Sequence, residues 1–539
     1  MFSKKIPLLV LASLLSGSML VGCSQTGNNV GQSENITAKQ ILQNEDARLA
    51  ISMAIDKAQI TDVILNNGSL PANVYVPEGL ALDEDGKDYR EIAGEMGFEF
   101  DQEKAAEHWK KAKDELGFDN TTLEFLTTDS DTSNQLEQNL EGLTIEIKQV
   151  PFKQKQQLES QGDFELLYSS WIADYPDPLT FLETFTTTGK FGSNSGYNSA
   201  EYNKLVDEAK NSLTLANSWK KFAEAEKVLL NDAYISPVYQ SSSAYLEKST
   251  VKDIVKSAYG ARNTYKWAYV EGKDSFNITS SADLPSLDAS KTTDFYSFDV
   301  LNNIMEGLTR VDLDGKVVEG MATKWETSED KKTWTFTIND KAYWSNGDKV
   351  TAHDFEYAWK RTLNPETGSQ YGFIFYDLVG AEDYSLGKCS ADDVGVKALD
   401  DNTLQVTLVR PVNYFYRLVG FPVFFPQNQK FVEEKGDKYG TTKDDILSNG
   451  PFELTRWKLE DQYTMSKNEK YWDKDVVKLQ TINTKIVKDS STGINLYEAG
   501  EVDSIDLAAE HVDKFKESPE FKSTKNATTF FILINAGEE

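Results

Sequence analysis

Cysteine and histidine are scarce in this sequence. Its 539 residues include only two cysteines, Cys23 and Cys389, and three histidines, His108, His353 and His511. Two cysteines this far apart build no disulfide framework if Cys23 is modified, and isolated histidines offer no zinc or redox motif. We therefore predict a protein without a metal ion or a cofactor.

Hydrolase motifs are absent as well. The sequence contains neither Gly-x-Ser-x-Gly nor His-Glu-x-x-His, and its scattered histidines supply few general bases. A peptidase and a glycosidase with paired carboxylates stay open as alternatives, although no motif supports either. We predict that the protein is not an enzyme; cleavage of a peptide library would contradict this.

Positive charge is in deficit, and long apolar runs are almost missing. With 56 Lys and Arg against 86 Asp and Glu, the net charge of -30 would repel nucleic acid. The one long apolar run, residues 6–20, is too short to span a membrane. Lys4 and Lys5 precede it and Leu-Val-Gly-Cys23 ends it, a pattern that is similar to a bacterial lipoprotein signal peptide.

We therefore expect a signal peptide over residues 1–23 and a lipid on Cys23 that anchors the protein to the outer face of the cell membrane. Residues 24–41 are polar and rich in Gly, Asn and Ser, which predicts a flexible tether. Ordinary secretion with a chance cysteine is the alternative.

After the tether, the sequence alternates between helix and strand patterns. Asn44 and Asp101 are placed to cap two amphipathic helices, and short apolar strands follow, so residues 42–233 read as an α/β lobe. Residues 306–425 read as α+β, with alternating strands at 334–338 and 404–408. Between these strands, Thr351 and Asp354 have the spacing of a capping box.

Many short motifs together carry a family resemblance. They are residues 318–361 and the segments 46–48, 54–57, 171–175, 286–288, 304–309, 449–452, 471–472 and 500–503. The sequence resembles the extracellular solute-binding proteins, family 5, of oligopeptide and dipeptide ABC importers. The resemblance implies a bilobed, type II periplasmic-binding-protein-like α/β fold of three domains. It also implies a monomer that closes around a peptide and delivers it to a membrane permease.

The order of the two halves departs from the family. The block that comes late in the family, about 42–273, precedes the early block, 274–539, so the chain resembles a circular permutant with its junction near 272–273. We predict domain III over 42–233, domain I over 234–305 and 426–539, and domain II over 306–425. We also hypothesise that only the chain crossing near Asp232-Ala233-Tyr234 stays covalent, which would loosen the hinge.

The resemblance places the ligand site in two segments. Asp174 would bind the peptide's ammonium group, and its alternative role is a turn aspartate that bonds its own backbone. Main-chain contacts are implied for two sets: Ile172 and Ala173 in one lobe, and Thr293, Asp294 and Phe295 in the other. Trp171 and Tyr175 would form walls of the pocket, or either could simply be part of the hydrophobic core. Asp177, followed by Pro178, reads instead as a structural helix cap.

Two further alternatives concern function on the same fold. A receptor for a signalling or pheromone peptide would share these motifs, because a fold does not fix its ligand. A rearranged product with impaired binding is the other alternative.

Overall fold

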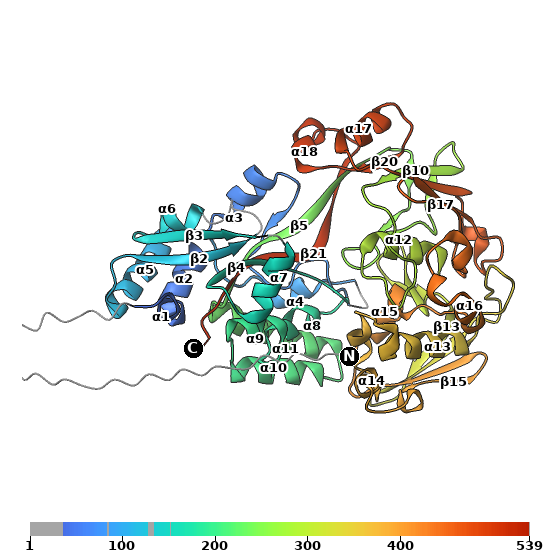
Figure 1. Ribbon diagram of the computed structural model, residues 1–539, viewed down its shortest axis with the longest axis horizontal. Helices are drawn as coiled ribbons and strands as arrows, with labels where there is room; N and C mark the ends of the chain where they lie inside the picture. Colours follow the sequence, from blue (N-terminus) through green and yellow to red (C-terminus); the bar gives the residue numbers. More distant parts are fainter. Residues whose placement is uncertain (1–35, 84–85, 128–133, 151, 538–539) are drawn as a thin grey trace, which may run out of the picture.

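The protein has two lobes connected by two long strands, β5 (Ile235–Glu247) and β21 (Phe521–Ile534) (Figure 1). The computed structural model describes residues 36–83, 86–127, 134–150 and 152–537. Cys23, the predicted signal peptide and most of the predicted tether lie outside these ranges. No helix in the described ranges combines the length and apolar character needed to cross a membrane.

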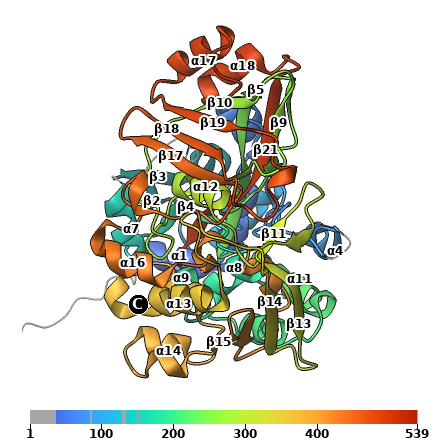
Figure 2. The ribbon, with the colours of Figure 1, turned by 90° about the vertical axis from the view of Figure 1, so that its right-hand side faces the viewer.

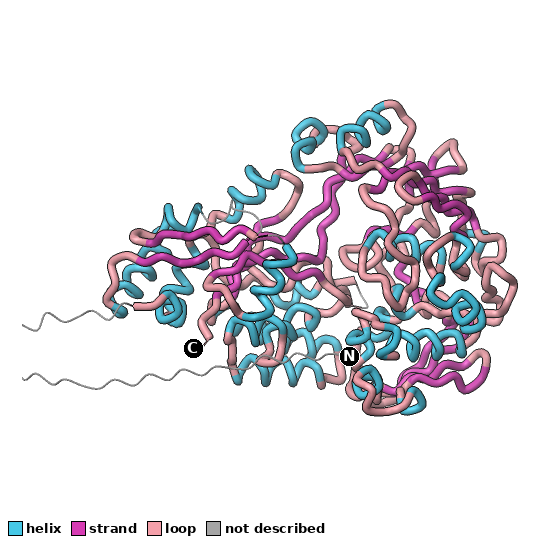
Figure 3. The backbone as a smooth tube through the Cα atoms, viewed as in Figure 1, coloured by secondary structure: helices cyan, strands magenta, loops and turns pink. Residues whose placement is uncertain are grey.

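One mixed sheet of eleven strands extends through both lobes (Figure 3). Its order is β17-β18-β19-β10-β20-β5-β21-β4-β2-β3, with β1 paired to β5 off this path. The strands β4, β2 and β3 run parallel to one another, whereas β21 is antiparallel to both of its neighbours, β4 and β5. Parallel strands with helices between them are typical of an α/β lobe, as the sequence predicted.

The described residues of 36–233 form one lobe, called here the distal lobe. It is built around β4, β2 and β3, which lie at one end of the large sheet. Its strands are β1 (Leu70–Pro71), β2 (Thr121–Thr127), β3 (Leu143–Gln149) and β4 (Leu166–Ile172). Its helices are α1 (Ala38–Gln43), α2 (Glu45–Met53), α3 (Lys57–Gln59), α4 (Tyr89–Ala93), α5 (Gln102–Leu116), α6 (Asn134–Asn139), α7 (Phe152–Gln161), α8 (Leu179–Leu182), α9 (Lys190–Ser195), α10 (Ala200–Lys210) and α11 (Leu215–Asn231).

The two predicted helix caps of the distal lobe are confirmed. The side chain of Asn44 accepts a hydrogen bond from the N–H of Ala47 at the start of α2. Asp101 does the same for Lys104 in α5, which ends at Gly117 with a left-handed φ of 76°. Both helices bury their apolar faces in one core, so the local capping signals and the packing agree.

The other part of the large sheet forms the proximal lobe. Its strands and helices are β10 (Ser275–Ser280), β17 (Phe452–Lys458), β18 (Gln462–Lys467), β19 (Thr481–Ile486), β20 (Ser504–Asp506), α12 (Phe295–Ile304), α16 (Gln429–Lys435), α17 (Ser490–Glu498) and α18 (Ala509–Phe515). Two small ladders lie beside it, β6 (Val251–Lys252) with β9 (Tyr269–Val270), and β7 (Val255–Lys256) with β8 (Asn263–Thr264).

The predicted α+β region over 306–425 is attached to the proximal lobe (Figure 2). Its elements are β11 (Thr309–Val311), β12 (Val317–Glu319), β13 (Ala322–Thr327), β14 (Thr333–Ile338), β15 (Val396–Asp400), β16 (Thr403–Thr407), α13 (Ala352–Leu363), α14 (Ala381–Ser385) and α15 (Phe415–Leu418). Trp334, Phe336 and Ile338 point into the core from β14, as their alternation predicted. The capping box of Thr351 and Asp354 opens α13.

The structure corrects two predicted boundaries. The tether expected over 24–41 ends earlier, because α1 begins at Ala38 and buries Ile41. The second part of domain I, expected over 426–539, ends near residue 527. Beyond that point β21 pairs with β4, and Ile532 and Ile534 belong to the core of the distal lobe.

The hypothesis of a single covalent crossing is wrong. Both β5 and β21 run without a break from one lobe into the other, and they pair with each other along most of their length. Each strand contributes to the cores of both lobes; in β5, for example, Val238 is buried in the distal core and Leu246 in the cluster beside α17. The lobes are therefore connected by two chain segments.

Candidate functional site

A cavity of about 400 Å³ lies between the lobes, beside the strands β5 and β21 that connect them. One wall is the carboxyl end of β4, and the other is the start of α12 with the loop around residue 260. Seven of the eight residues predicted to contact a ligand line this one cavity: Trp171, Ile172, Ala173, Asp174, Thr293, Asp294 and Phe295. They come from segments more than a hundred positions apart in the chain.

Among the described residues, the end of β4 from Ser169 to Ile172 has no partner strand on the edge that faces away from β21, and this edge is called here the free edge. The strand pairs with β2 only at Leu166 and Leu167, whereas its other edge stays paired with β21 as far as Ile172. The N–H of Ala173 donates to the carbonyl oxygen of Ala527 at 2.9 Å, which carries this pairing past the end of the strand. The free edge suits the addition of an extended peptide.

Thr180 holds the turn that follows β4. Its carbonyl oxygen accepts a hydrogen bond from the indole N–H of Trp171 at 2.6 Å, and its hydroxyl oxygen accepts one from the N–H of Asp174 at 3.1 Å. These bonds fix the turn without using the carboxylate of Asp174. That carboxylate is therefore free to face the cavity.

The Asp174 carboxylate has a polar but uncharged partner. Its Oδ1 accepts a hydrogen bond from the hydroxyl of Tyr371, in the other lobe, at 3.4 Å. The pKa of Asp174 is raised to about 7, chiefly by burial and also by the nearby carboxylate of Glu183, while the bond from Tyr371 opposes the shift. No cationic side chain among the described residues forms an ion pair with Asp174.

The opposite wall is the first turn of α12. Asp294 caps this helix, because its side chain accepts a hydrogen bond from the N–H of Ser297 at 2.9 Å. Within the described part of the chain, no hydrogen bond takes up the N–H groups of Thr293, Asp294 and Phe295. Free donors at a helix start attract acceptor groups, and carbonyl or carboxylate oxygens of a ligand are of this kind.

Tyr175, the eighth predicted residue, does not line the cavity. It is buried against domain II, where its ring stacks on Tyr414 with centroids 5.2 Å apart and an angle of 4° between the planes. Its hydroxyl donates a hydrogen bond to Glu183. The plain-core alternative weighed for this residue is therefore the better description.

Asp177 takes the structural role that the sequence predicted, with a shift of one position. Its Oδ1 accepts a hydrogen bond from the N–H of Leu179 at 3.0 Å. The helix α8 begins at Leu179, so Pro178 occupies the cap position and not the first helical position. Asp177 is almost fully buried, and burial raises its pKa to about 7.

A bulge in β21 forms the bottom of the cavity. Lys525 pairs with Ser242 and Thr529 pairs with Gln240, so three residues of β21 oppose a single residue of β5. The bulged backbone is held from the proximal lobe as well, because the N–H of Ala527 donates to the carbonyl oxygen of Ala258 at 2.8 Å. Bulges commonly redirect side chains beside functional sites.

Sequence reasoning missed several residues of the cavity: Lys155, Lys190, Arg262, Tyr371, Asn526 and Thr528. None of them carried a local signal; Asn526 and Thr528, for example, lie in the polar stretch 522–529, where nothing in the sequence distinguishes them from their neighbours. Within the described ranges, no group of three or more His, Cys, Asp or Glu side chains is arranged to hold a metal ion.

Comparisons with known proteins agree on one family. The sequence model of "Bacterial extracellular solute-binding proteins, family 5 Middle" matches residues 19–193 and 316–539, together well over half of the chain. The dipeptide-binding protein DppE of Bacillus subtilis (strain 168) is 40% identical over 280 residues, covering 52% of this chain and 51% of that protein. The oligopeptide-binding protein OppA of the same strain is 47% identical over 234 residues, covering 43% of each.

A solved structure is similar in sequence over part of the chain. Listeria monocytogenes OppA bound to peptide is 44% identical, with a TM-score of 0.42, over 43% of this chain and 46% of that one. The chain thus spans about half the length of the curated relatives that it matches.

Proposed function

The chain belongs to the bacterial extracellular solute-binding proteins of family 5, and from this premise we propose that it captures peptides between its lobes and delivers them to an ABC transporter permease. One observation carries the proposal: the carboxylate of Asp174, which has no cationic partner among the described residues, lies at a cavity between two lobes. The fold would be the bilobed type II periplasmic-binding-protein-like architecture, with three domains and a monomeric state.

The proposed mechanism uses what all peptides share. The ammonium group of the peptide pairs with the Asp174 carboxylate, and a charge-assisted bond in a closed cavity is strong. The peptide main chain adds to the free edge of β4 near Ile172 and Ala173, and accepts from the free N–H groups at the start of α12. The side chains of the peptide would occupy pockets that make few specific polar contacts with them, so peptides of many sequences would fit.

Calorimetric titration tests this proposal directly. Trialanine should bind at least about tenfold more tightly than N-acetyl-trialanine, because acetylation removes the charge that Asp174 pairs with. In the Asp174→Asn variant the two peptides should bind alike. Equal affinity of both peptides for the unaltered protein would overturn the role of Asp174. Native mass spectrometry of co-purified ligand separates a transport protein, with a mixture of peptides, from a signalling receptor with one defined peptide.

The proposal includes a circular permutation of the family's order. Two facts support it. The family model matches this chain in two separate blocks, 19–193 and 316–539. DppE and OppA each align with only about half of this chain and half of their own length, although they are about as long as this chain. The junction at 272–273 is a tight turn, with Gly272 at φ 77° and the N–H of Lys273 donating to the carbonyl oxygen of Val270. The segments near residues 43 and 537 meet, because Gln43 Nε2 donates to the carbonyl oxygen of Gly537 at 3.1 Å.

Reversing the order tests the permutation. A chain joined from the 537 region to the 43 region, and opened between 272 and 273, should fold and bind trialanine within about threefold of the original affinity, since the same segments meet in space. A reordered chain that folds but binds no peptide, while the original order binds, would contradict the proposal.

The location proposed for the protein is the outer face of the bacterial cell membrane, with a lipid on Cys23 after removal of residues 1–22. The support is the pattern of charges, apolar run and cysteine in the sequence. A Cys23→Ser chain should leave the membrane fraction, and its retention there would contradict the anchor.

A further inference from the structure

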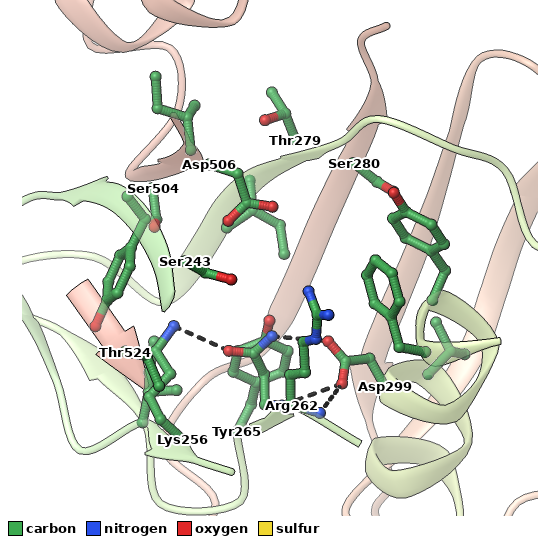
Figure 4. A pocket seen from close by; sticks show the side chains of 18 of the residues that line it. Ser243, Lys256, Arg262, Tyr265, Thr279, Ser280, Asp299, Ser504, Asp506 and Thr524 are labelled. Atoms are coloured by element: carbon green, nitrogen blue, oxygen red, sulfur yellow. Dashed lines mark hydrogen bonds between the residues drawn. The ribbon is translucent and has the colours of Figure 1, made fainter. Parts of the chain in front are cut away.

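A second, smaller chamber of about 110 Å³ lies beside α12 (Figure 4). Its lining comes from the start of α12, from β5, β10, β18, β20 and β21, and from the segment 254–265. No described residue of the distal lobe lines it, so its walls do not depend on contact between the lobes. The chamber adjoins the cavity between the lobes, because Arg262, Phe295 and Asn526 line both spaces.

One wall of the chamber carries a carboxylate without a partner, that of Asp506. In β20 the neighbouring side chain of Ile505 packs into the cluster beside α17, so Asp506 is directed to the opposite face of the sheet. Figure 4 shows Asp506 pointing into the chamber. Within the described ranges its carboxylate takes part in no hydrogen bond or ion pair; burial raises its pKa, and the charges of Lys256 and Arg262 oppose this shift.

The guanidinium of Arg262 also lines the chamber, and it has no hydrogen-bond acceptor among the described residues. Its backbone is held by Asp299, one oxygen of which accepts hydrogen bonds from the N–H groups of Arg262 and Asn263. The guanidinium carbon lies 3.8 Å from the centroid of the Phe295 ring, a cation–π contact that limits its motion. No ion pair joins Arg262 to Asp506 in the part of the chain that the structure describes.

The other charged side chains of the chamber are already engaged. The second oxygen of Asp299 accepts a hydrogen bond from the Asn263 side chain at 2.7 Å, and Lys256 donates to the oxygen of that side chain at 2.9 Å. Asp506 and Arg262 are therefore left as an acceptor and a donor that line one chamber without meeting. Charged groups that are removed from bulk water and left unpaired are costly, so a ligand group that bonds to both would be held firmly.

A primary carboxamide has the two groups that this arrangement needs. Its carbonyl oxygen can accept from the guanidinium of Arg262, while its NH2 group donates to the carboxylate of Asp506. A carboxylate side chain would be repelled by Asp506, and an ammonium side chain by Arg262 and Lys256. An apolar side chain would leave both charged groups without a partner. The rings of Tyr265 and Tyr463 in the walls can pack against the methylene groups that carry the amide.

We propose that the chamber beside α12 binds the side chain of a glutamine or asparagine residue of the bound peptide, with Asp506 and Arg262 as the pair that determines this specificity. The inference rests on the proposed function and adds one selective pocket to a site that otherwise accepts many sequences. The side chain would enter from the cavity between the lobes at Phe295, beside the free N–H groups at the start of α12.

The test uses alanine tetrapeptides that carry one glutamine or one asparagine at the second, third or fourth position. Calorimetry finds the position and the amide that bind most tightly, and that position is then filled with alanine, glutamate, lysine or methionine. The amide peptide should bind at least about tenfold more tightly than each of these four, because only the amide satisfies both charged groups. Glutamate and methionine have nearly the size of glutamine, so size alone would not produce this difference.

Variants of the chamber assign the preference to its two residues. In Asp506→Ala the glutamate peptide should become the tightest binder, by at least about threefold, because the cations of Arg262 and Lys256 then lack an opposing carboxylate. In Arg262→Met the preference for the amide over methionine should fall to about onefold. Glu501→Gln is the matched control: it removes an exposed carboxylate near β20 that does not line the chamber, and it should leave the preference unchanged. Each preference is a ratio of affinities within one variant, so a general change in affinity cancels.

Failure of the inference and failure of the proposed function give different results. If the unaltered protein binds all of these peptides alike, or prefers another side chain to both amides, the inference is overturned while peptide binding stands. An amide preference that persists in both Asp506→Ala and Arg262→Met would belong to other residues and would also overturn it. If no tetrapeptide of the series binds the unaltered protein, it is the proposed function that fails.

Discussion

Asp174 and Asp177 stand three positions apart, and burial raises the pKa of each to about 7. Their surroundings nevertheless divide their roles. Asp177 caps Leu179 from a fully enclosed position, so its carboxylate is committed to the fold. Within the described ranges, the carboxylate of Asp174 accepts a hydrogen bond only from the Tyr371 hydroxyl, and Asp174 lines the cavity. A raised pKa alone would not have separated a structural from a binding carboxylate; the cavity does.

The raised pKa of Asp174 predicts how binding depends on pH. An ammonium group pairs with the ionised carboxylate, and that form is lost as the pH falls through about 7. The affinity for trialanine should therefore fall by about tenfold per pH unit below 7, as one proton competes with the ligand. Calorimetry between pH 5 and 8 measures this slope.

Two controls accompany the pH measurement. N-acetyl-trialanine, which has no ammonium group, should lack the slope. Because the Glu183 carboxylate adds to the raised pKa, Glu183→Gln should move the onset of the slope to lower pH. The folded pKa lies above the unfolded value of about 3.9, so the ligand-free protein should also gain stability as the pH falls through 7. Identical slopes for both peptides would exclude Asp174 as the titrating group.

The sequence predicted individual cavity residues where they belong to a recognisable motif. The family resemblance singled out Trp171 to Asp174, and all four line the cavity, so they stay predicted ligand contacts. It misplaced Tyr175, since only the fold shows that Tyr414, more than two hundred positions later, covers that ring. Arg262 and Tyr371 were missed for the same reason: their roles depend on which segments the lobes bring together, and neither lies in a distinctive pattern.

At the scale of elements, capping residues and alternation predicted helices and strands well. Asn44, Asp101 and the Thr351–Asp354 pair each begin a helix at the expected position, because a cap is satisfied by neighbours in sequence. Which strands pair with one another was harder to predict from the sequence. The path of β21 from one lobe into the other, and its three-residue bulge, depend on partners in β4, β5 and the Ala258 loop.

The correction to the chain crossings changes what is expected of the hinge. Because β5 and β21 both span the lobes, opening must bend a paired two-strand ribbon and not a single segment. The ladder between them has two irregularities, the bulge at residues 526–528 and a smaller register shift between Phe530 and Phe531; bending should be easiest at the larger one, the bulge. This same bulge carries Ala527, which is hydrogen-bonded to Ala173 in one wall of the cavity and to Ala258 in the other, so bending at the bulge would move both walls.

At the scale of the whole molecule, contacts outside the cavity hold the lobes together. Tyr175 stacks on Tyr414, and the side chain of Asn413 donates to the carbonyl oxygen of Ser212 at 3.0 Å. Arg410 pairs with Asp377 and extends a longer contact of 3.4 Å to the carbonyl oxygen of Lys210. The stacked rings, the Asn413 bond and the Arg410–Lys210 contact cross from residues 306–425 to the distal lobe, whereas the Arg410–Asp377 pair lies within 306–425 and orients Arg410. None of these contacts needs a ligand. Together they form an interlobe clasp that favours the closed form.

Weakening this clasp should open the ligand-free protein. Tyr414→Ala removes a stacked aromatic pair, which contributes about 0.5–1.5 kcal/mol beyond its buried area. The closed fraction, and with it the apparent affinity for trialanine, should drop by about two- to tenfold, since affinity scales with the competent fraction. Small-angle scattering of the ligand-free variant should give a larger radius of gyration, which trialanine at saturation restores. Tyr343→Ala, which truncates an exposed tyrosine of the same domain, is the matched control and should change neither quantity. If Tyr414→Ala lowers the free energy of unfolding while radius and affinity stay at their original values, the stacked pair supports only the fold, and closure is governed by the ribbon of β5 and β21.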